Sequence, residues 1–450
     1  MYIRRFAPLI LLLSVFTFNA FSQSFSLSGE FRPRIEYRDG FKTLPALDAE
    51  PAFLVNERTR LIVDYKSKRV NFRFTPQHTG LFGQNSYINS AENNFSIYEA
   101  YADLNLCSKE LDSSKGPDLL KFRIGRQALN YDGGRILSNL DWPPQGIRHD
   151  AAVLFLEEKG WEVILGAAFN QQSDELTGTA FYGNYYKSLQ FARLHHKFKN
   201  LDFAVLFLKD DFQNVLTDSA GIISTNGVNS RITTGTRLKY TVSPGVNIHG
   251  EFYQQLGEDL AYNSLNAQLY SIEVEFKLAN KKLVITPGVD MLSGNDGVAG
   301  EDQTPENTNR FFTPSYGINH KFYGHADYFY CGNGFGDAGL KDIYIRTSYA
   351  FTSKFNTWVH LHAYQSFTEI ADLTNPTQSV SPYLGTEIDW LLNYTFDDQV
   401  TVQFGTCFMF GSETLKQVKQ LIPEETRSVG NFTYLQFKFT PKFFESKVAG

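Results

Sequence analysis

The stretch Phe25-Ser-Leu-Ser-Gly-Glu-Phe-Arg-Pro-Arg-Ile-Glu-Tyr37 decides the fold, because its side chains alternate between two characters. One parity holds the apolar residues Phe25, Leu27, Phe31, Ile35 and Tyr37. The other parity holds the polar and charged residues Ser26, Ser28, Glu30, Arg32, Arg34 and Glu36. Residues two apart share one face of a β-strand. The stretch therefore predicts a strand with one apolar face and one charged face.

The same period-two alternation recurs along the chain and predicts about 18 strands, an even number as expected for a single-chain bacterial barrel. The segments that carry it are 24–38, 51–66, 69–80, 95–106, 118–130, 147–158, 161–171, 185–198, 201–211, 229–242, 246–257, 265–278, 281–292, 339–351, 355–368, 383–396, 399–411 and 429–440.

The links between these segments alternate in length. Short links lie at 67–68, 158–160, 199–200, 243–245, 279–280, 352–354 and 397–398. Long links lie at 39–50, 81–94, 131–146, 172–184, 212–228, 293–338, 369–382 and 412–428, and the link 107–117 is longer than its place in the series predicts. Outer-membrane barrels have short periplasmic turns and long extracellular loops. The rhythm therefore predicts an all-β fold, a closed antiparallel transmembrane β-barrel.

Composition and the first residues agree with that fold. The chain has 40 Phe and 24 Tyr yet a net charge of −6, which suits strands with one face in lipid and one in water. Residues 1–5 are basic, and 6–18 form an apolar run too short for a bilayer, which needs about 20 residues. This predicts a signal peptide over 1–22, with a membrane anchor as the alternative. Residues 23–450 then form a single barrel domain.

Arginine is frequent on the polar parity. Charged groups facing lipid at mid-depth cost about 2–4 kcal/mol, so these side chains are expected in the lumen. Guanidinium groups bind carboxylates through two parallel hydrogen bonds, and rings of Arg select anions in some pores. The alternative is that each arginine pairs with a carboxylate of the same face, such as Glu30 or Asp64, and only braces the wall. The candidate anion pathway is Arg32, Arg34, Arg58, Arg60, Arg73, Arg123, Arg148, Arg231, Arg237 and Arg346.

The link 293–338 is much longer than ordinary loops, which reach about 12–15 residues. It is rich in aromatic residues, so we expect it to pack against something. Folding back into the lumen would constrict the pore, whereas the alternative is an extracellular loop packed on itself. Its candidate pore residues are Arg310, His320, Lys321, His325 and Asp327.

No sequence motif indicates a catalytic centre, and the one candidate for calcium, Asn295-Asp296-Gly297 with Glu301 and Asp302, is explained equally well as an acidic surface loop. The adjacent His195 and His196 point to opposite faces of a strand and cannot share one ion. Cys107, Cys331 and Cys407 lack the C-x-x-C spacing of a metal or redox site. No nucleophile-elbow or zinc-protease motif is present. We expect no catalysis, no cofactor, no metal and no nucleic-acid partner.

Several segments resemble the alginate-export family of outer-membrane barrels. They are Phe122 to Gln127, Tyr131 to Arg135, Asp141-Trp142, Arg148 to Asp150, and Asn319 to Asp327. The resemblance implies an 18-stranded barrel with an arginine-rich, anion-selective lumen that passes an acidic polysaccharide such as alginate. Arg126 departs from the expected pattern, because it falls on the outward parity set by Phe122 and Ile124. The position of Arg126 predicts that the strand either ends near Gly125 or contains a β-bulge there, which would turn the following side chains to the opposite face.

The predicted function is a channel in the outer membrane of a Gram-negative bacterium that passes anionic solutes by facilitated diffusion. Its expected partners are outer-membrane lipid and the anionic solute or acidic polysaccharide, and a periplasmic partner is left open. Two alternatives come from other classes: a barrel enzyme of the lipase or protease type, and an adhesive or structural barrel. The missing catalytic motifs count against the first, and the large barrel counts against the second.

Overall fold

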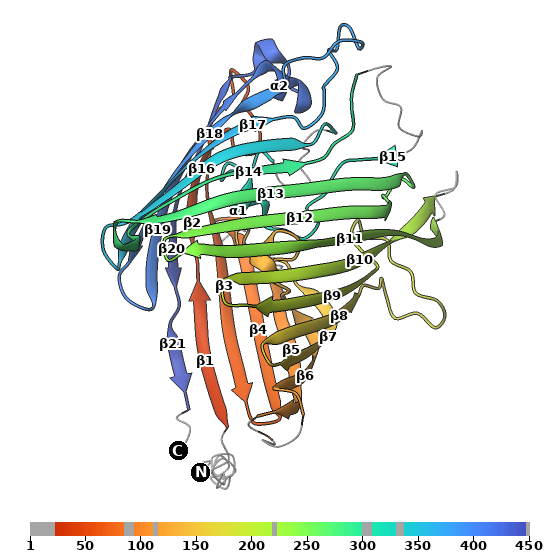
Figure 1. Cartoon of the computed structure of the whole chain (residues 1–450), viewed down its shortest axis with the longest axis vertical. Coiled ribbons are helices and arrows are strands. Elements are labelled where there is room, and N and C mark those ends of the chain that lie inside the picture. Colours follow the sequence, from red (N-terminus) through yellow and green to blue (C-terminus); the bar gives the residue numbers. More distant parts are fainter. Residues whose placement is uncertain are drawn as a thin grey trace, which may run out of the picture.

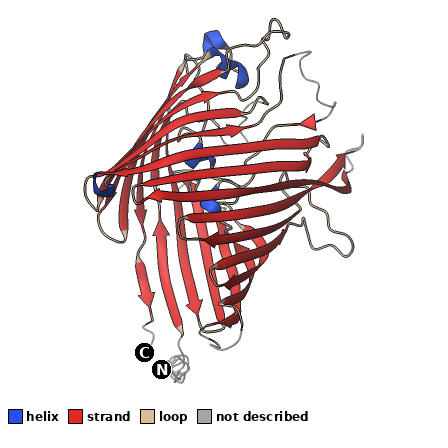
Figure 2. Cartoon of the chain, viewed as in Figure 1, coloured by secondary structure: helices blue, strands red, loops and turns tan. Residues whose placement is uncertain are grey.

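The structure is a computed structural model that describes residues 23–84, 94–109, 111, 116–217, 223–298, 308–329 and 337–446. The predicted signal peptide, residues 1–22, lies outside the described residues. No helix in the described ranges is long and apolar enough to cross a membrane. Nearly every regular element is a strand, and the strands form one continuous sheet (Figures 1 and 2).

The strands run in the order β1 (Ser24–Phe31), β2 (Arg34–Asp39), β3 (Ala52–Lys66), β4 (Val70–Leu81), β5 (Phe95–Ser108), β6 (Leu119–Gln127), β7 (His149–Glu158), β8 (Trp161–Phe169), β9 (Ser188–Lys197), β10 (Leu201–Thr217), β11 (Ile223–Ser243), β12 (Val246–Glu258), β13 (Ser264–Leu278), β14 (Leu283–Leu292), β15 (Thr308–Asn309), β16 (Leu340–Ala350), β17 (Phe355–Gln365), β18 (Tyr383–Thr395), β19 (Val400–Gly411), β20 (Val429–Phe439) and β21 (Lys442–Glu445). The helical turns are η1 (Asp132–Gly134), η2 (Ala279–Lys281), α1 (Asn319–Phe322), α2 (Glu413–Val418) and η3 (Pro423–Glu425).

These elements make a closed antiparallel barrel of 18 strands, as the alternation predicted. β1 and β2 are two parts of one barrel strand, interrupted at Pro33, and β20 and β21 are likewise interrupted at Pro441. Proline has no backbone N–H to donate to a neighbouring strand, so each interruption falls at a residue that cannot form that hydrogen bond. The two-residue β15 pairs only with the end of β13 and is not a wall strand.

The first and last strands close the barrel. β2 pairs with β20, so that Arg34 lies opposite Gln436, and β1 pairs with β21. Ser24, at the start of β1, lies opposite Lys66, which begins a short turn. Both described ends of the chain therefore lie at the short-turn end of the barrel, at the bottom of Figure 1.

The outer surface carries the apolar parity. Its large exposed side chains come from strands all around the barrel and include Phe53, Ile124, Leu165, Phe207, Ile272, Ile345, Leu361, Trp390 and Phe408. A sheet that exposes this much apolar surface on one face is stable only against lipid. The polar parity faces inward, where Glu36, Arg58, Asp290 and Glu387 are fully buried.

Two local predictions are wrong. The predicted link 212–228 is largely strand, because β10 continues to Thr217 and β11 begins at Ile223. Where both faces of a strand contact water, its side chains no longer alternate between apolar and polar. The alternation in the sequence therefore ended before the hydrogen-bonded pairing of β10 with β11 did. The strand β6 neither ends near Gly125 nor changes register there, and it continues in register to Gln127. Arg126 does point outward, where both of its hydrogen bonds to Asp150 are 2.8 Å long.

Candidate functional site: the lumen and two inserted loops

Two long loops contact the inner wall of the barrel. One joins β6 to β7 (residues 128–148), and the other joins β14 to β16 (residues 293–339). They also contact each other, because Leu137 and Tyr316 form an isolated β-bridge. The backbone N–H of Ser138 donates to the carbonyl of Tyr316 at 3.0 Å, and that of Tyr316 donates to Ile136 at 3.1 Å. The two loops therefore form one unit inside the wall, where α1 is labelled in Figure 1.

Arg135 holds the 128–148 loop to one side of the lumen. Its guanidinium is 2.7 Å from a carboxylate oxygen of Asp290 and 3.2 Å from one of Glu251. It also lies 4.0 Å from the ring centroid of Phe322 and donates to the Tyr323 hydroxyl at 3.1 Å. Since only 2 % of Arg135 is exposed, these contacts replace its hydration almost completely. One side chain thus joins both loops to the barrel wall.

Asp141 and Trp142 hold the same loop to the opposite side. The Asp141 carboxylate lies 2.8 Å from Arg58 and 3.3 Å from Arg32. The guanidinium of Arg34 stacks on the Trp142 ring at 3.8 Å and donates to the Trp142 carbonyl at 2.9 Å. Arg32, Arg34, Arg58 and Arg60 lie on the first two barrel strands and form one dense arginine patch, to which the loop supplies a carboxylate.

Wall carboxylates neutralise much of the remaining charge of that patch. Arg58 bonds Glu30 at 2.6 Å, and Arg34 bonds Glu36 at 2.6 Å. Arg60 lies 3.7 Å from Asp141 and stacks on a tyrosine ring. The arrangement matches the bracing alternative more closely than a freely accessible anion ring.

The other predicted arginines show the same pairing, with one exception. Arg148 is adjacent to the inward-facing His149, so it lies on the same outward-facing side as the exposed Asp150. The charged groups that influence it include Arg126 and Asp150. It therefore lies apart from the inward set. The inward pairs, by closest N–O distance, are Arg73–Asp64 at 2.8 Å, Arg123–Asp103 at 2.5 Å, Arg231–Asp210 at 2.5 Å, Arg237–Asp202 at 3.7 Å and Arg346–Glu273 at 3.4 Å.

The candidate pore-loop residues lie in different surroundings. His320 stacks on Trp142, with ring centroids 3.7 Å apart, and bonds Asp327 at 2.9 Å. The ammonium of Lys321 donates to the carbonyl of Gly133 at 2.9 Å, and His325 bonds Asp389 at 3.0 Å. Arg310 is half-buried, and its backbone N–H donates to Asn295. The side chains of His320, Lys321, His325 and Asp327 thus bond or stack against other residues within the lumen.

Acidic side chains line the inner wall from β10 to β18, and Glu387 and Asp389 among them fall on the inward parity that the alternation predicts. Asp210, Asp290, Asp342, Glu387 and Asp389, on strands from β10 to β18, are all completely buried. Their positions follow the alternation, since Glu387 and Asp389 are two residues apart on β18, as His360 and His362 are on β17. That shared-face spacing predicts the inward position of Glu387 and Asp389 from the sequence. The loop partners of the buried carboxylates, such as Arg135, come from distant parts of the chain and carry no such signal.

Two cavities lie in the lumen. One has a volume of about 650 Å³ and is bordered by Arg34, Arg38, Lys42 and Asp327 among others. The second, of about 630 Å³, is bordered by Arg32, Glu273, Arg346 and His360 among others. Trp142 and His320 are the residues that line both cavities. Their stacked rings therefore form the partition between the two spaces.

The partition should weaken in acid because of His320. Burial, opposed by Asp327 and assisted by His325 and Arg34, lowers the pKa of His320 to about 4 from a usual value of 6.5. The folded state disfavours the protonated ring, so its contribution to stability is complete above pH 6.5 and is lost as pH falls toward 4. The loss approaches about 3 kcal/mol. Conductance should rise over this pH range, and protease should cut the 293–339 loop faster.

The matched measurement uses His320→Gln, which cannot gain a proton. The variant should lose the part of the pH response between 6.5 and 4. An identical conductance–pH curve in the wild type and the variant would assign the response to other groups.

The comparisons with known proteins agree with this architecture. The OccK5 (OpdH) structure of Pseudomonas aeruginosa has a TM-score of 0.59 at 11 % identity, covering 95 % of this chain and 100 % of that one. A BenF-like porin of Pseudomonas fluorescens Pf-5 also reaches 0.59 at 11 % identity, covering 93 % and 99 %. OpdO of Pseudomonas aeruginosa reaches 0.58 at 12 % identity, covering 93 % and 98 %. At such identities the likeness shows the fold alone.

No curated protein matches the chain in sequence. The model of one family, described as alginate export, matches residues 24–420, which is nearly the whole described barrel. With its closed barrel, apolar outer surface and porin fold, the chain belongs to the alginate-export family and is a protein of the Gram-negative outer membrane.

Proposed function

We propose that the protein is a passive channel for carboxylate-bearing solutes, and that the cavity of about 650 Å³ is its solute-binding site. One observation carries this proposal. Arg34, Arg38 and Lys42 border the cavity, whereas Asp327 is the one carboxylate among its described lining residues. Glu36 behind the lining pairs with both Arg34 and Arg38, yet three cationic side chains against the two carboxylates Glu36 and Asp327 leave the balance of charge positive. Such a field concentrates anions in a narrow, partly desolvated space.

The rest of the lining suits a solute with many hydroxyl groups. Side-chain amides of Asn56, Gln84, Asn94 and Gln145 can donate to and accept from hydroxyls, and Phe41 and Trp142 supply apolar surface. This combination favours an acidic sugar chain, such as the alginate in the name of the family, over a simple inorganic anion. OpdK from Pseudomonas aeruginosa, which shares the fold at a TM-score of 0.56 and 9 % identity, has a crystal structure with vanillate, a carboxylate.

The buried arginine patch has a different role in this proposal. Arg32, Arg58 and Asp141 are mutually paired, so they hold the 128–148 loop in place and do not bind the solute directly. Passage from one cavity to the other requires the Trp142–His320 stack to separate. No covalent step is involved, so the channel is not an enzyme.

Selectivity measurements on a double variant test the proposal. Arg38→Gln with Lys42→Gln removes two of the charges that border the cavity, while Glu36 keeps Arg34 and Asn56 as partners. The anion-to-cation permeability ratio in planar bilayers should fall about fivefold, since a partly exposed charge contributes about 0.5–1 kcal/mol. The difference should shrink at high salt, because the Debye length falls to about 3 Å at 1 M.

The control is Lys68→Gln with Lys199→Gln, which removes the same charge from exposed short turns. A third protein, Arg38→Lys, keeps the charge but loses the forked contact, so it should retain anion selectivity and bind a uronate oligomer more weakly. If the cavity variant and the turn variant change the permeability ratio equally, the cavity is not the selective element.

A further inference from the structure

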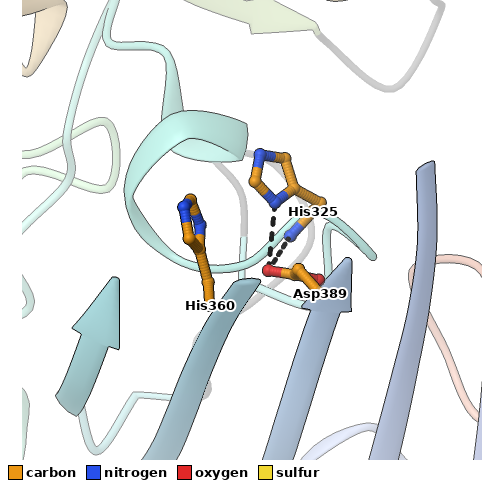
Figure 3. Close-up of side chains that lie close together, drawn as sticks. All are labelled: His325, His360 and Asp389. Atoms are coloured by element: carbon orange, nitrogen blue, oxygen red, sulfur yellow. Dashed lines mark hydrogen bonds and ion pairs between the residues drawn. The ribbon is translucent and has the colours of Figure 1, made fainter. Parts of the chain in front are cut away.

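We propose that the lumen holds a divalent transition-metal ion between His325, His360 and Asp389. His360 lies on β17 and Asp389 lies on β18, directly opposite each other in the strand register. His325 comes from the 293–339 loop and faces both (Figure 3). One ligand atom from each of the three residues lies within 4.8 Å of the other two.

The distances suit an ion of the size of Zn²⁺. Ligand atoms about 2.0–2.1 Å from a tetrahedral ion lie about 3.3 Å from one another. The Nδ1 atom of His325 is already 3.0 Å from a carboxylate oxygen of Asp389. The rings of His325 and His360 have centroids 5.3 Å apart, so a small rotation of His360 brings the third ligand to the ion. Two imidazoles and one carboxylate form a donor set typical of Zn²⁺ and related ions.

Asp389 has bonding capacity that the protein leaves unused. It is completely buried, and its second carboxylate oxygen, Oδ1, has no hydrogen-bond partner among the described residues. The neighbouring Glu387 is also completely buried, and its Oε2 atom likewise lacks a partner there. Buried carboxylate oxygens are costly when unpaired, and a cation removes that cost.

Neighbouring side chains support the ligands from behind. His362 Nε2 lies 3.9 Å from Asp389, and its Nδ1 bonds Asp342 at 2.9 Å. Glu387 accepts the backbone N–H of Ala326 at 2.8 Å, which fixes the chain next to His325. Outer partners of this kind orient ligands in known metal centres.

An ion can reach this site. His325 and His360 both line the cavity of about 630 Å³. A second group of possible ligands, Glu387, Asp389 and Cys407, is completely buried and therefore less accessible. We therefore place the ion at His325, His360 and Asp389, because the two histidines border the cavity.

The position of His325 gives the ion a structural consequence. The preceding Gly324 has φ +88°, and a Cβ there would lie 2.3 Å from the Tyr364 hydroxyl and 2.5 Å from Glu387. Only glycine lets the loop approach the wall so closely. An ion bound to His325 on the loop and to two strands would fasten the 293–339 loop across the lumen. This inference does not depend on which solute the channel passes.

The test uses the full-length protein purified in detergent, stripped with EDTA and titrated with ZnCl₂ in a calorimeter. One Zn²⁺ should bind per chain. His360→Gln and Asp389→Asn should each weaken binding at least about tenfold. His196→Gln is the control, because His196 is half-buried on the outer face, where it stacks on Trp161 away from the lumen. Heat-modifiable gel mobility confirms that each variant is folded.

A second readout follows the loop itself. Zn²⁺ should slow protease cleavage of the 293–339 loop in the wild type, EDTA should reverse this protection, and His360→Gln should not show it. Absence of Zn²⁺ binding to folded wild-type protein would overturn the proposal. Equal binding by the wild type and His360→Gln would do the same, because the ion would then lie elsewhere. Neither result would affect the anion selectivity on which the proposed function rests.

Discussion

Replacing residues 293–339 with an Asn-Gly turn should raise single-channel conductance several-fold while the barrel still inserts and folds. Leu292 and Leu340 are direct cross-strand partners, so a two-residue hairpin turn can join β14 to β16. The deletion removes His320 and with it one half of the partition between the two cavities. It also removes the buried aromatic residues Phe312, Tyr328 and Phe329 from the lumen.

The control deletion removes residues 174–177 from the link between β8 and β9, which leaves a three-residue hairpin loop. These residues are exposed, and the backbone N–H of Gln172 already donates to the carbonyl of Ala180 at 3.0 Å, which makes closure easy. This variant should conduct like the wild type. If the 293–339 deletion also conducts like the wild type in a folded barrel, the loop does not obstruct the ion path.

Arg135→Met should release both loops at once. The change leaves Asp290 completely buried without its main cationic partner, and removing one member of a buried pair costs about 3–5 kcal/mol. The midpoint of heat-induced unfolding on gels should fall, and protease should cut both the 128–148 and 293–339 loops. Adding Asp290→Asn should restore part of the stability, because it removes the uncompensated charge.

Arg73→Met is the matched control. Arg73 also faces inward and pairs with Asp64, but its side chain is 35 % exposed and the pair involves neither loop. A partly solvated pair contributes about 0–1 kcal/mol, so this variant should unfold near the wild-type temperature. Equal losses for the two variants would mean that Arg135 braces the wall without holding the loops.

The strands and their two faces follow from local sequence. Period-two alternation in segments such as 25–37 and 399–411 is set by neighbouring residues, and a strand with one apolar face stays in lipid only when the barrel is closed. Strand number, closure and the inward direction of arginines such as Arg58 were therefore predictable. The exceptions, at 212–228 and at Arg148, lie near strand ends, where lipid no longer distinguishes the two faces.

The tertiary structure alone decided what those inward charges do. Arg32 meets Asp141 across 109 positions of sequence, and Arg135 meets Asp290 across 155. No local period encodes contacts between a loop and a distant wall. Their energy depends on burial, which the closed barrel creates, so a pattern that predicts an arginine-lined lumen cannot predict its neutralisation. The sequence thus determined the barrel and its polarity, whereas the packing of two loops inside it determined the cavities, the partition and the His325–His360–Asp389 cluster.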